Sequence, residues 1–116
     1  MNTDIELVLP VSPMALPVRR LQDEGFWLVE VDKGETRISR NEDYSGMSVD
    51  DTVSAFLRSL CSISDVLEPH MTTLRIGVYY DIEETVVFPF FLSSSSIRKI
   101  ASLSLSLEAT GYPCAT

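Results

Sequence analysis

The residues best suited to chemistry in this sequence are three carboxylates that stand close together past the middle of the chain. Asp81, Glu83 and Glu84 could share a proton or hold a hard cation, because paired carboxylates offer both kinds of chemistry. They lie between two apolar segments, and this placement is typical of a hairpin turn. Carboxylates in such a turn are normally solvated. The sequence therefore predicts no catalytic residue and no metal site in this group.

His70 is the single histidine and the only side chain that could act as an imidazole base. It follows Pro69 in an expected loop with no nucleophile motif beside it, so we expect a solvent-exposed histidine. The serines at 93–96 could bind phosphate at a helix N-terminus. They lack the glycines and the lysine of a phosphate loop, and helix capping accounts for them. We therefore expect a protein that is not an enzyme and uses no cofactor.

The balance of charge indicates which class of partner the chain could bind. Seventeen acidic residues stand against nine lysines and arginines, and the net charge is −8. Such a charge repels phosphate backbones and argues against a nucleic-acid partner. The same field attracts a basic protein and speeds its encounter with the chain. Solubility alone is the alternative explanation of the acidity.

Length and composition indicate a single α+β domain over residues 1–116. Hydrophobic residues make up 45% and charged residues 22%, an ordinary mixture for a globular domain of this size. No apolar run approaches the roughly 18 to 20 residues that cross a bilayer, and no secretory signal is visible. We expect a cytoplasmic protein with no membrane partner. Cys61, on the apolar side of a helix, and Cys114 should then be free thiols.

Hydrophobic periodicity predicts where the strands and helices lie. Strands are expected over residues 4–9, 26–31, 36–40, 74–82, 86–92 and 103–109. A first helical turn is expected at 18–21. The clearest helix should begin at Ser48 and end near Ile63, with Asp50 and Asp51 favoured in its first turn by the helix dipole. A second helix should follow the serines at 93–96.

The order of these elements predicts the fold class. Most neighbouring strands are joined by short turns, and helices are interspersed among them. An antiparallel sheet with two helices on one face satisfies this order. The expected α+β fold is therefore ferredoxin-like or built from split-βαβ units.

Three stretches of the sequence resemble a known bacterial family. They are FWLVEV at 26–31, VSAFLRSL at 53–60, and LRIGVYYDI at 74–82 followed by FFLSSSSIRKIASLSLSLEATGY at 90–112. The chain resembles the family called domain of unknown function 4279, whose members include immunity proteins. The resemblance implies a serine-started helix before a final strand that ends near Tyr112, and it implies no catalytic residues. The prolines near the N-terminus depart from the family pattern.

Two functions follow from these observations. An immunity-type protein would bind a cognate, basic toxin through a flat or convex acidic surface. The residues expected to contact the partner are Glu42, Asp43, Tyr44, Tyr79, Asp81, Glu83 and Glu84. The alternative is a small-ligand-binding or enzymatic domain with a concave pocket on an open sheet face, lined by Tyr79, Trp27 and His70, and containing a group with a shifted pKa.

Two further expectations concern single elements. Trp27 suits either a core anchor or a binding surface, and the core is the favoured position. The chain could also form a homo-oligomer if the alternating strand at 103–109 lies at the edge of the sheet and pairs there.

Overall fold

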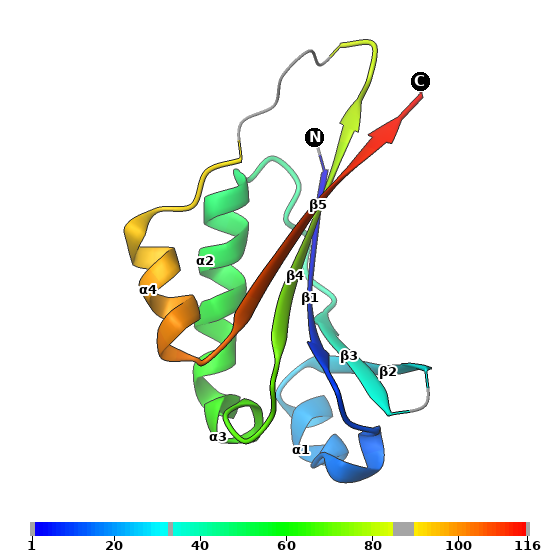
Figure 1. Cartoon of the computed structure of the whole chain (residues 1–116), viewed down its shortest axis with the longest axis vertical. Coiled ribbons are helices and arrows are strands. Elements are labelled where there is room, and N and C mark those ends of the chain that lie inside the picture. The colour runs from blue at the N-terminus through cyan, green and yellow to red at the C-terminus, as the bar shows by residue number, and fades with distance from the viewer. Residues whose placement is uncertain (1, 33, 85–89, 116) are drawn as a thin grey trace.

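The computed structural model describes residues 2–32, 34–84 and 90–115 (Figure 1). The strands are β1 (Asn2–Leu9), β2 (Phe26–Asp32), β3 (Glu35–Arg40), β4 (Thr73–Asp81) and β5 (Ser106–Cys114). The helices are α1 (Val18–Asp23), α2 (Val49–Leu60), α3 (Ser64–Leu67) and α4 (Ser94–Ser102), with short 3₁₀ turns at Pro13–Ala15 and Cys61–Ile63. The predicted α+β class is confirmed.

The described strands form one five-stranded sheet in the order β2-β3-β1-β4-β5. The pairs β2·β3, β3·β1 and β1·β4 are antiparallel. In this order, β3 lies between β1 and β2, and β1 lies between β3 and β4. The segments β1-α1-β2 and β3-α2-β4 are therefore both split-βαβ units. The first four strands therefore have the predicted ferredoxin-like order, and α4 and β5 extend the sheet beyond β4.

The expectation of a purely antiparallel sheet is wrong, because β5 runs parallel to β4. The chain returns from β4 to β5 through α4, and a crossover of this kind allows parallel pairing. The last strand also begins later than predicted. Helix α4 extends to Ser102, and Ser104 then adopts a left-handed conformation with a φ of 58°, so the leucines at 103 and 105 belong to a turn.

The strand predicted over 86–92 falls largely outside the described residues, which omit 85–89. Residues 90–92 are described and have no regular secondary structure. The structure therefore contains no described partner for β5 other than β4.

Helix α2 forms where its cap and apolar stripe predict it. The Ser48 Oγ accepts a hydrogen bond of 3.0 Å from the Asp51 backbone N–H, and Val53, Phe56 and Leu57 are fully buried. The α-helix ends at Leu60, and the chain continues as a 3₁₀ turn and α3. Cys61 therefore lies past the helix end and is exposed, so the expectation that it faces the apolar side is wrong.

The hydrophobic core lies between one face of the sheet and the helices. Strand β1 alternates, with Ile5 and Leu7 buried in the core and Asp4 and Glu6 less buried on the other side. Helices α2 and α4 pack side by side on the core face, as predicted, and α1 lies against β2 (Figure 1). Within the described ranges, no helix is long and apolar enough to cross a membrane.

Asp50 ties the N-terminus of α2 to the N-terminus of α4. Its carboxylate accepts hydrogen bonds of 2.8 Å from the Ser93 backbone N–H and from the Ser96 hydroxyl. These bonds, the Ser93 backbone bond first, hold the pKa of Asp50 below its ordinary value of 3.8. The sequence assigned this residue to the helix dipole alone. Asp50 is therefore also a tertiary link between two helices.

Replacing Asp50 by alanine is expected to lower the free energy of unfolding by about 1 to 3 kcal/mol, because two donors lose a charged acceptor. A lowered pKa means that this stabilisation is present above the ordinary carboxyl pKa and is lost as the pH falls below it. The difference between wild type and Asp50→Ala in urea unfolding should therefore shrink in acid. Asp51→Ala, which removes a carboxylate from the same turn without these bonds, is the control.

Candidate functional site

The face of the sheet opposite α2 and α4 is hollowed into a groove of about 770 Å³. All five strands and the loop at 41–45 contribute lining residues, and none of these residues belongs to a helix. Trp27 lies toward the β2 side of the sheet and Tyr112 toward the β5 side. Strands spaced about 4.8 Å apart place these two outer strands about 19 Å from each other. The groove therefore crosses the whole sheet.

The loop at 41–45 forms one wall of the groove, and Arg40 fixes the start of this loop. The Arg40 guanidinium donates to the Glu24 carbonyl at 2.9 Å and to the Glu42 carboxylate at 2.8 Å. It also lies 4.8 Å from the centre of the Phe26 ring. Because Phe26 is buried, the loop is tied to the core at this point.

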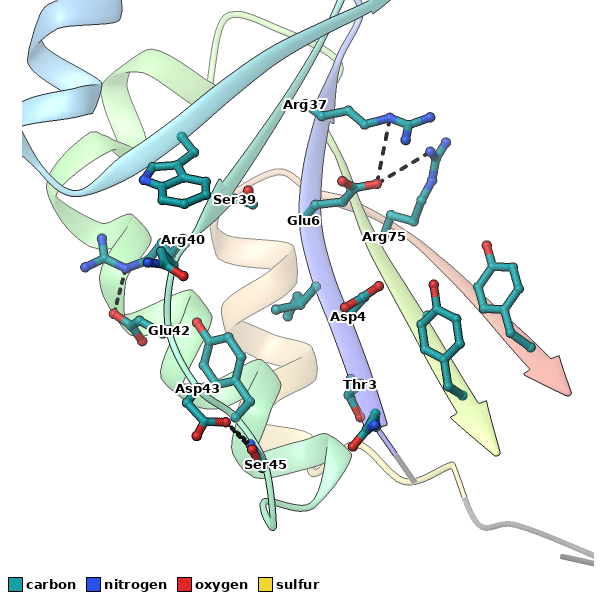
Figure 2. Close-up of a pocket in the computed structure, with 18 residues that line it drawn as sticks. Thr3, Asp4, Glu6, Arg37, Ser39, Arg40, Glu42, Asp43, Ser45 and Arg75 are labelled. Atoms are coloured by element: carbon teal, nitrogen blue, oxygen red, sulfur yellow. Dashed lines mark hydrogen bonds and ion pairs between the residues drawn. The ribbon is translucent and has the colours of Figure 1, made fainter. Parts of the chain in front are cut away.

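Asp43 occupies the middle of the same wall. Its Oδ1 accepts hydrogen bonds from the Ser45 backbone N–H, at 2.9 Å, and from the Ser45 hydroxyl. The hydroxyl bond is the larger cause of an Asp43 pKa below the ordinary value. Figure 2 shows both residues on the loop, across the groove from Asp4 on β1. Asp43 is therefore held as a carboxylate facing the groove.

Three charged side chains of alternating sign, Arg37, Glu6 and Arg75, cross the floor of the groove, and Glu108 beside it continues the row. Glu6 on β1 lies 3.8 Å from Arg37 on β3 and 3.7 Å from Arg75 on β4 (Figure 2). Arg75 also lies 3.5 Å from Glu108 on β5. The register places Glu6 opposite Arg75 and Arg75 opposite Glu108. Such cross-strand ion pairs each contribute modestly in a solvated position. Their main effect is to neutralise one another.

A pair of stacked tyrosines lies at the β5 side of the groove. The Tyr79 and Tyr112 rings have centres 4.9 Å apart and planes 20° apart. Gly77 makes room for this pair, because a Cβ at this position would lie 3.0 Å from the Tyr112 ring. Hydrogen bonding to the Asp4 carboxylate raises the pKa of the Tyr79 phenol. The aromatic platform and a carboxylate therefore adjoin each other.

Tyr44 packs against the core from the loop side of the groove. Its hydroxyl is enclosed and makes no hydrogen bond of ordinary length and angle. Burial, with the neighbouring Glu42 carboxylate, raises the pKa of Tyr44 to about 12. Burial thus widens the pH range over which the Tyr44 phenol stays neutral and able to donate a hydrogen bond.

Two carboxylates of the groove have no basic partner among the described residues. Glu6 and Glu42 pair with arginines, whereas Asp4 and Asp43 form no ion pair within that part of the chain. A cationic side chain entering the groove would meet these two carboxylates and the Tyr44 and Tyr79 rings. The arrangement therefore suits a lysine or an arginine from outside the chain.

The structure brings together four of the seven residues expected to contact a partner. Glu42, Asp43, Tyr44 and Tyr79 all line the groove. The other three, Asp81, Glu83 and Glu84, lie at and beyond the end of β4 and do not line it. Asp81 accepts a 2.8 Å hydrogen bond from the Glu83 backbone N–H, which shapes the turn. Contact between these three residues and a partner stays a prediction.

The expected pocket on the open face has two of its three predicted residues. Tyr79 and Trp27 line the groove, but His70 does not. His70 is partly buried in the turn after α3 and not fully exposed as expected. The favoured core position of Trp27 is wrong, because 58% of this residue is exposed and the adjacent Phe26 takes the buried position. The surface is also concave and not the flat or convex patch expected for an inhibitor.

Sequence reasoning did not identify Asp4, Glu6, Arg37 or Arg75 as site residues, and it gave Tyr112 only as the end of the final strand. The first four stand at alternate positions of strands whose intervening residues are apolar, and this period-two pattern was a usable signal. The pattern does not show the order of the strands in the sheet. Only that order places one strand's arginine beside the next strand's glutamate.

The described residues contain no cluster of three or more histidine, cysteine or acidic side chains that could hold a metal ion. Comparison of the chain with known protein families, curated proteins and solved structures finds no match in any of the three. The resemblance to the domain of unknown function 4279 family, with the immunity role that it implies, therefore stays a prediction.

Proposed function

We propose that this chain is an immunity-type protein that binds a basic protein toxin in the groove of its open sheet face and thereby neutralises it. One observation carries the proposal: Asp4 and Asp43 have no basic partner within the described part of the chain and line the groove together with the half-buried Tyr44 and Tyr79. The sequence resemblance and the acidic composition point to the same class of protein. A cytoplasmic location belongs to this proposal.

The shape of the groove supports a protein partner. Sites for small ligands generally enclose most of the ligand's surface. This groove instead has lining residues on all five strands and is wider than the sites that enclose a small ligand. A loop or an extended segment of another protein would fill such a surface, with Trp27 and Tyr112 as aromatic anchors near its two ends.

The distribution of charge supports a basic partner. The three arginines that line the groove are already paired with carboxylates of this chain, so the groove has little free positive charge to offer an acidic partner. The net charge of −8 would draw a basic protein toward the molecule, and Asp4 and Asp43, which have no basic partner among the described residues, would then hold its cationic side chains.

The test compares two double variants that alter the net charge equally. Asp4→Lys with Asp43→Lys changes the groove, and Asp23→Lys with Glu68→Lys changes exposed positions outside it. Wild type and both variants serve as bait in a lysate of the source cell, and the affinity for the captured partner is then measured. We expect the affinity of the groove variant for the captured partner to fall by about 100-fold or more, since each carboxylate would form a charged hydrogen bond with the partner.

The outside variant should lose only the share of affinity that comes from long-range attraction, and this loss should diminish in high salt. Equal losses in the two variants would show that the groove has no specific role. Capture of an acidic partner would also contradict the proposal.

A second candidate function, small-ligand binding, is favoured by one observation. The enclosed Tyr44 hydroxyl makes no hydrogen bond of ordinary length and angle among the described residues, so a ligand could accept a hydrogen bond from it. Native mass spectrometry of the protein purified from its source would detect a retained molecule. If Tyr44→Phe released that molecule and no protein were captured by the wild type, this second function would replace the first.

A further inference from the structure

The two outer strands of the sheet, whose outer edges pair with no other described strand, differ in how well these edges are protected. Strand β2 carries Glu30 and Asp32 and has an irregular register between them. Charges and bulges of this kind keep edge strands from pairing with other chains. Strand β5 is nine residues long and regular throughout its register with β4, and Glu108 is its only charged residue. The β5 edge therefore lacks the protection that β2 has.

Two hydrogen bonds show which backbone groups of β5 face away from β4. Ser106 donates its N–H to the carbonyl of Thr72, which precedes β4, at 3.0 Å, and the Cys114 carbonyl accepts from Ile82 at 3.2 Å. In a strand, the N–H and C=O of one residue point to the same side, and those of the next residue point to the other. The backbone groups of Leu107, Ala109 and Gly111 therefore point outward.

Pro113 is the next outward residue, and it has no N–H to offer. The remaining outward N–H groups are those of Leu107, Ala109 and Gly111. Two antiparallel copies of β5 can use all three when Ala109 is the middle residue of the pairing. In an antiparallel pair of two copies with this centre, Leu107 lies opposite Gly111 and Ala109 lies opposite Ala109 of the other copy. Each such pair exchanges two backbone hydrogen bonds.

The charges on β5 fit the same arrangement. With Ala109 at the centre, Glu108 lies opposite Thr110, so the two Glu108 carboxylates do not face each other. Each carboxylate also has Arg75 of its own chain 3.5 Å away. The strand is thus almost free of net charge in a molecule of charge −8, and pairing here avoids the repulsion that other surfaces would bring.

A hollow on the helix side of β5 offers a place for one side chain of the second copy. It measures about 190 Å³ and is lined by Val78, Phe90, Ala109, Thr110 and Gly111. Leu107 lies on the same side of the sheet and is 44% exposed. Because Leu107 of one copy lies opposite Gly111 of the other, its side chain would enter this hollow.

From these observations we infer that β5 is a dimerisation edge at which two copies of this chain pair antiparallel about Ala109. The two sheets join into one, with a two-fold axis through the seam, so the interface is closed and does not propagate. The open faces of both copies then lie on the same side of the joined sheet. The dimer carries two grooves and does not depend on what either groove binds.

The test measures molar mass by light scattering and sedimentation velocity, from micromolar concentration to about 100 µM, since dimerisation depends on concentration. Wild type should approach twice 12.9 kDa. Leu107→Lys places a lysine on the edge, and Ala109→Pro removes an outward N–H without removing a bond to β4. Both variants should remain at 12.9 kDa with an unchanged circular dichroism spectrum. Val29→Lys, on the β2 edge, should dimerise like wild type.

A cysteine scan tests the register. In a background of Cys61→Ser and Cys114→Ser, oxidation should link Ala109→Cys to its copy, because Cα atoms about 5.5 Å apart in such a pair suit a disulfide. Thr110→Cys should link far less. Equal linking of the two would overturn the register. A wild type of 12.9 kDa at every concentration, or a dimer that survives both edge variants, would overturn the proposal.

Discussion

Replacing Phe56 by alanine is expected to lower the free energy of unfolding by about 3 to 5 kcal/mol. Phe56 is one of the two largest fully buried side chains, and it lies on the face of α2 that packs in the core. Removing its ring leaves a cavity between the helix and the sheet, and the surrounding aliphatic side chains fill such a cavity only in part. This is the largest stability effect that we expect from a single substitution.

Equilibrium unfolding in urea measures this effect, provided that the slope with denaturant stays the same. Arg58→Ala is the matched control, because Arg58 is exposed on the same helix and its loss should change stability by no more than about 0.5 kcal/mol. A loss below about 1 kcal/mol for Phe56→Ala would contradict the packing of α2 on the sheet.

Replacing Trp27 by alanine is expected to weaken partner binding by about 30-fold or more, which is a loss of about 2 kcal/mol or more. Trp27 is 58% exposed in the free protein and lines the groove from β2. An exposed tryptophan contributes little to folding, but it buries a large surface when a partner covers it. Binding should therefore fall while the free energy of unfolding changes little.

Val29→Ala is a closely matched control for this result. Val29 lies on the same strand, is also 58% exposed and does not line the groove. Its loss should leave the affinity within about two-fold of wild type, since a small side chain outside the contact contributes little. Equal effects of the two substitutions, measured by titration calorimetry with the captured partner, would place the binding surface elsewhere.

Much of the fold could be predicted from local patterns. The cap at Ser48 and the stripe that contains Phe56 define α2, because both signals act within one or two helical turns. The alternation from Leu74 to Tyr80 likewise defines β4. The last strand was placed too early because Leu103 and Leu105 continue its alternation. The left-handed conformation of Ser104 instead places these leucines in the turn between α4 and β5.

The candidate site could be predicted only in part, because it depends on contacts between distant segments. Polarity and turn chemistry identified Glu42, Asp43 and Tyr44 as surface residues. Nothing in the local sequence shows that this loop faces Asp4, since that proximity results from the order of the strands. The same limit applies to Trp27. A one-residue shift in the register of β2 decides whether Phe26 or Trp27 faces the core. Both side chains are large and aromatic, so the local sequence does not favour either register.

Hydroxyl-radical footprinting of the chain, free and bound to its captured partner, tests most directly whether the groove is the binding surface. We predict that labelling of Trp27, Tyr44 and Tyr79 falls on binding. Met14 and Met71, which are 96% and 87% exposed and do not line the groove, should be labelled equally in both states. Protection of the methionines with undiminished labelling of the three aromatic residues would contradict the account.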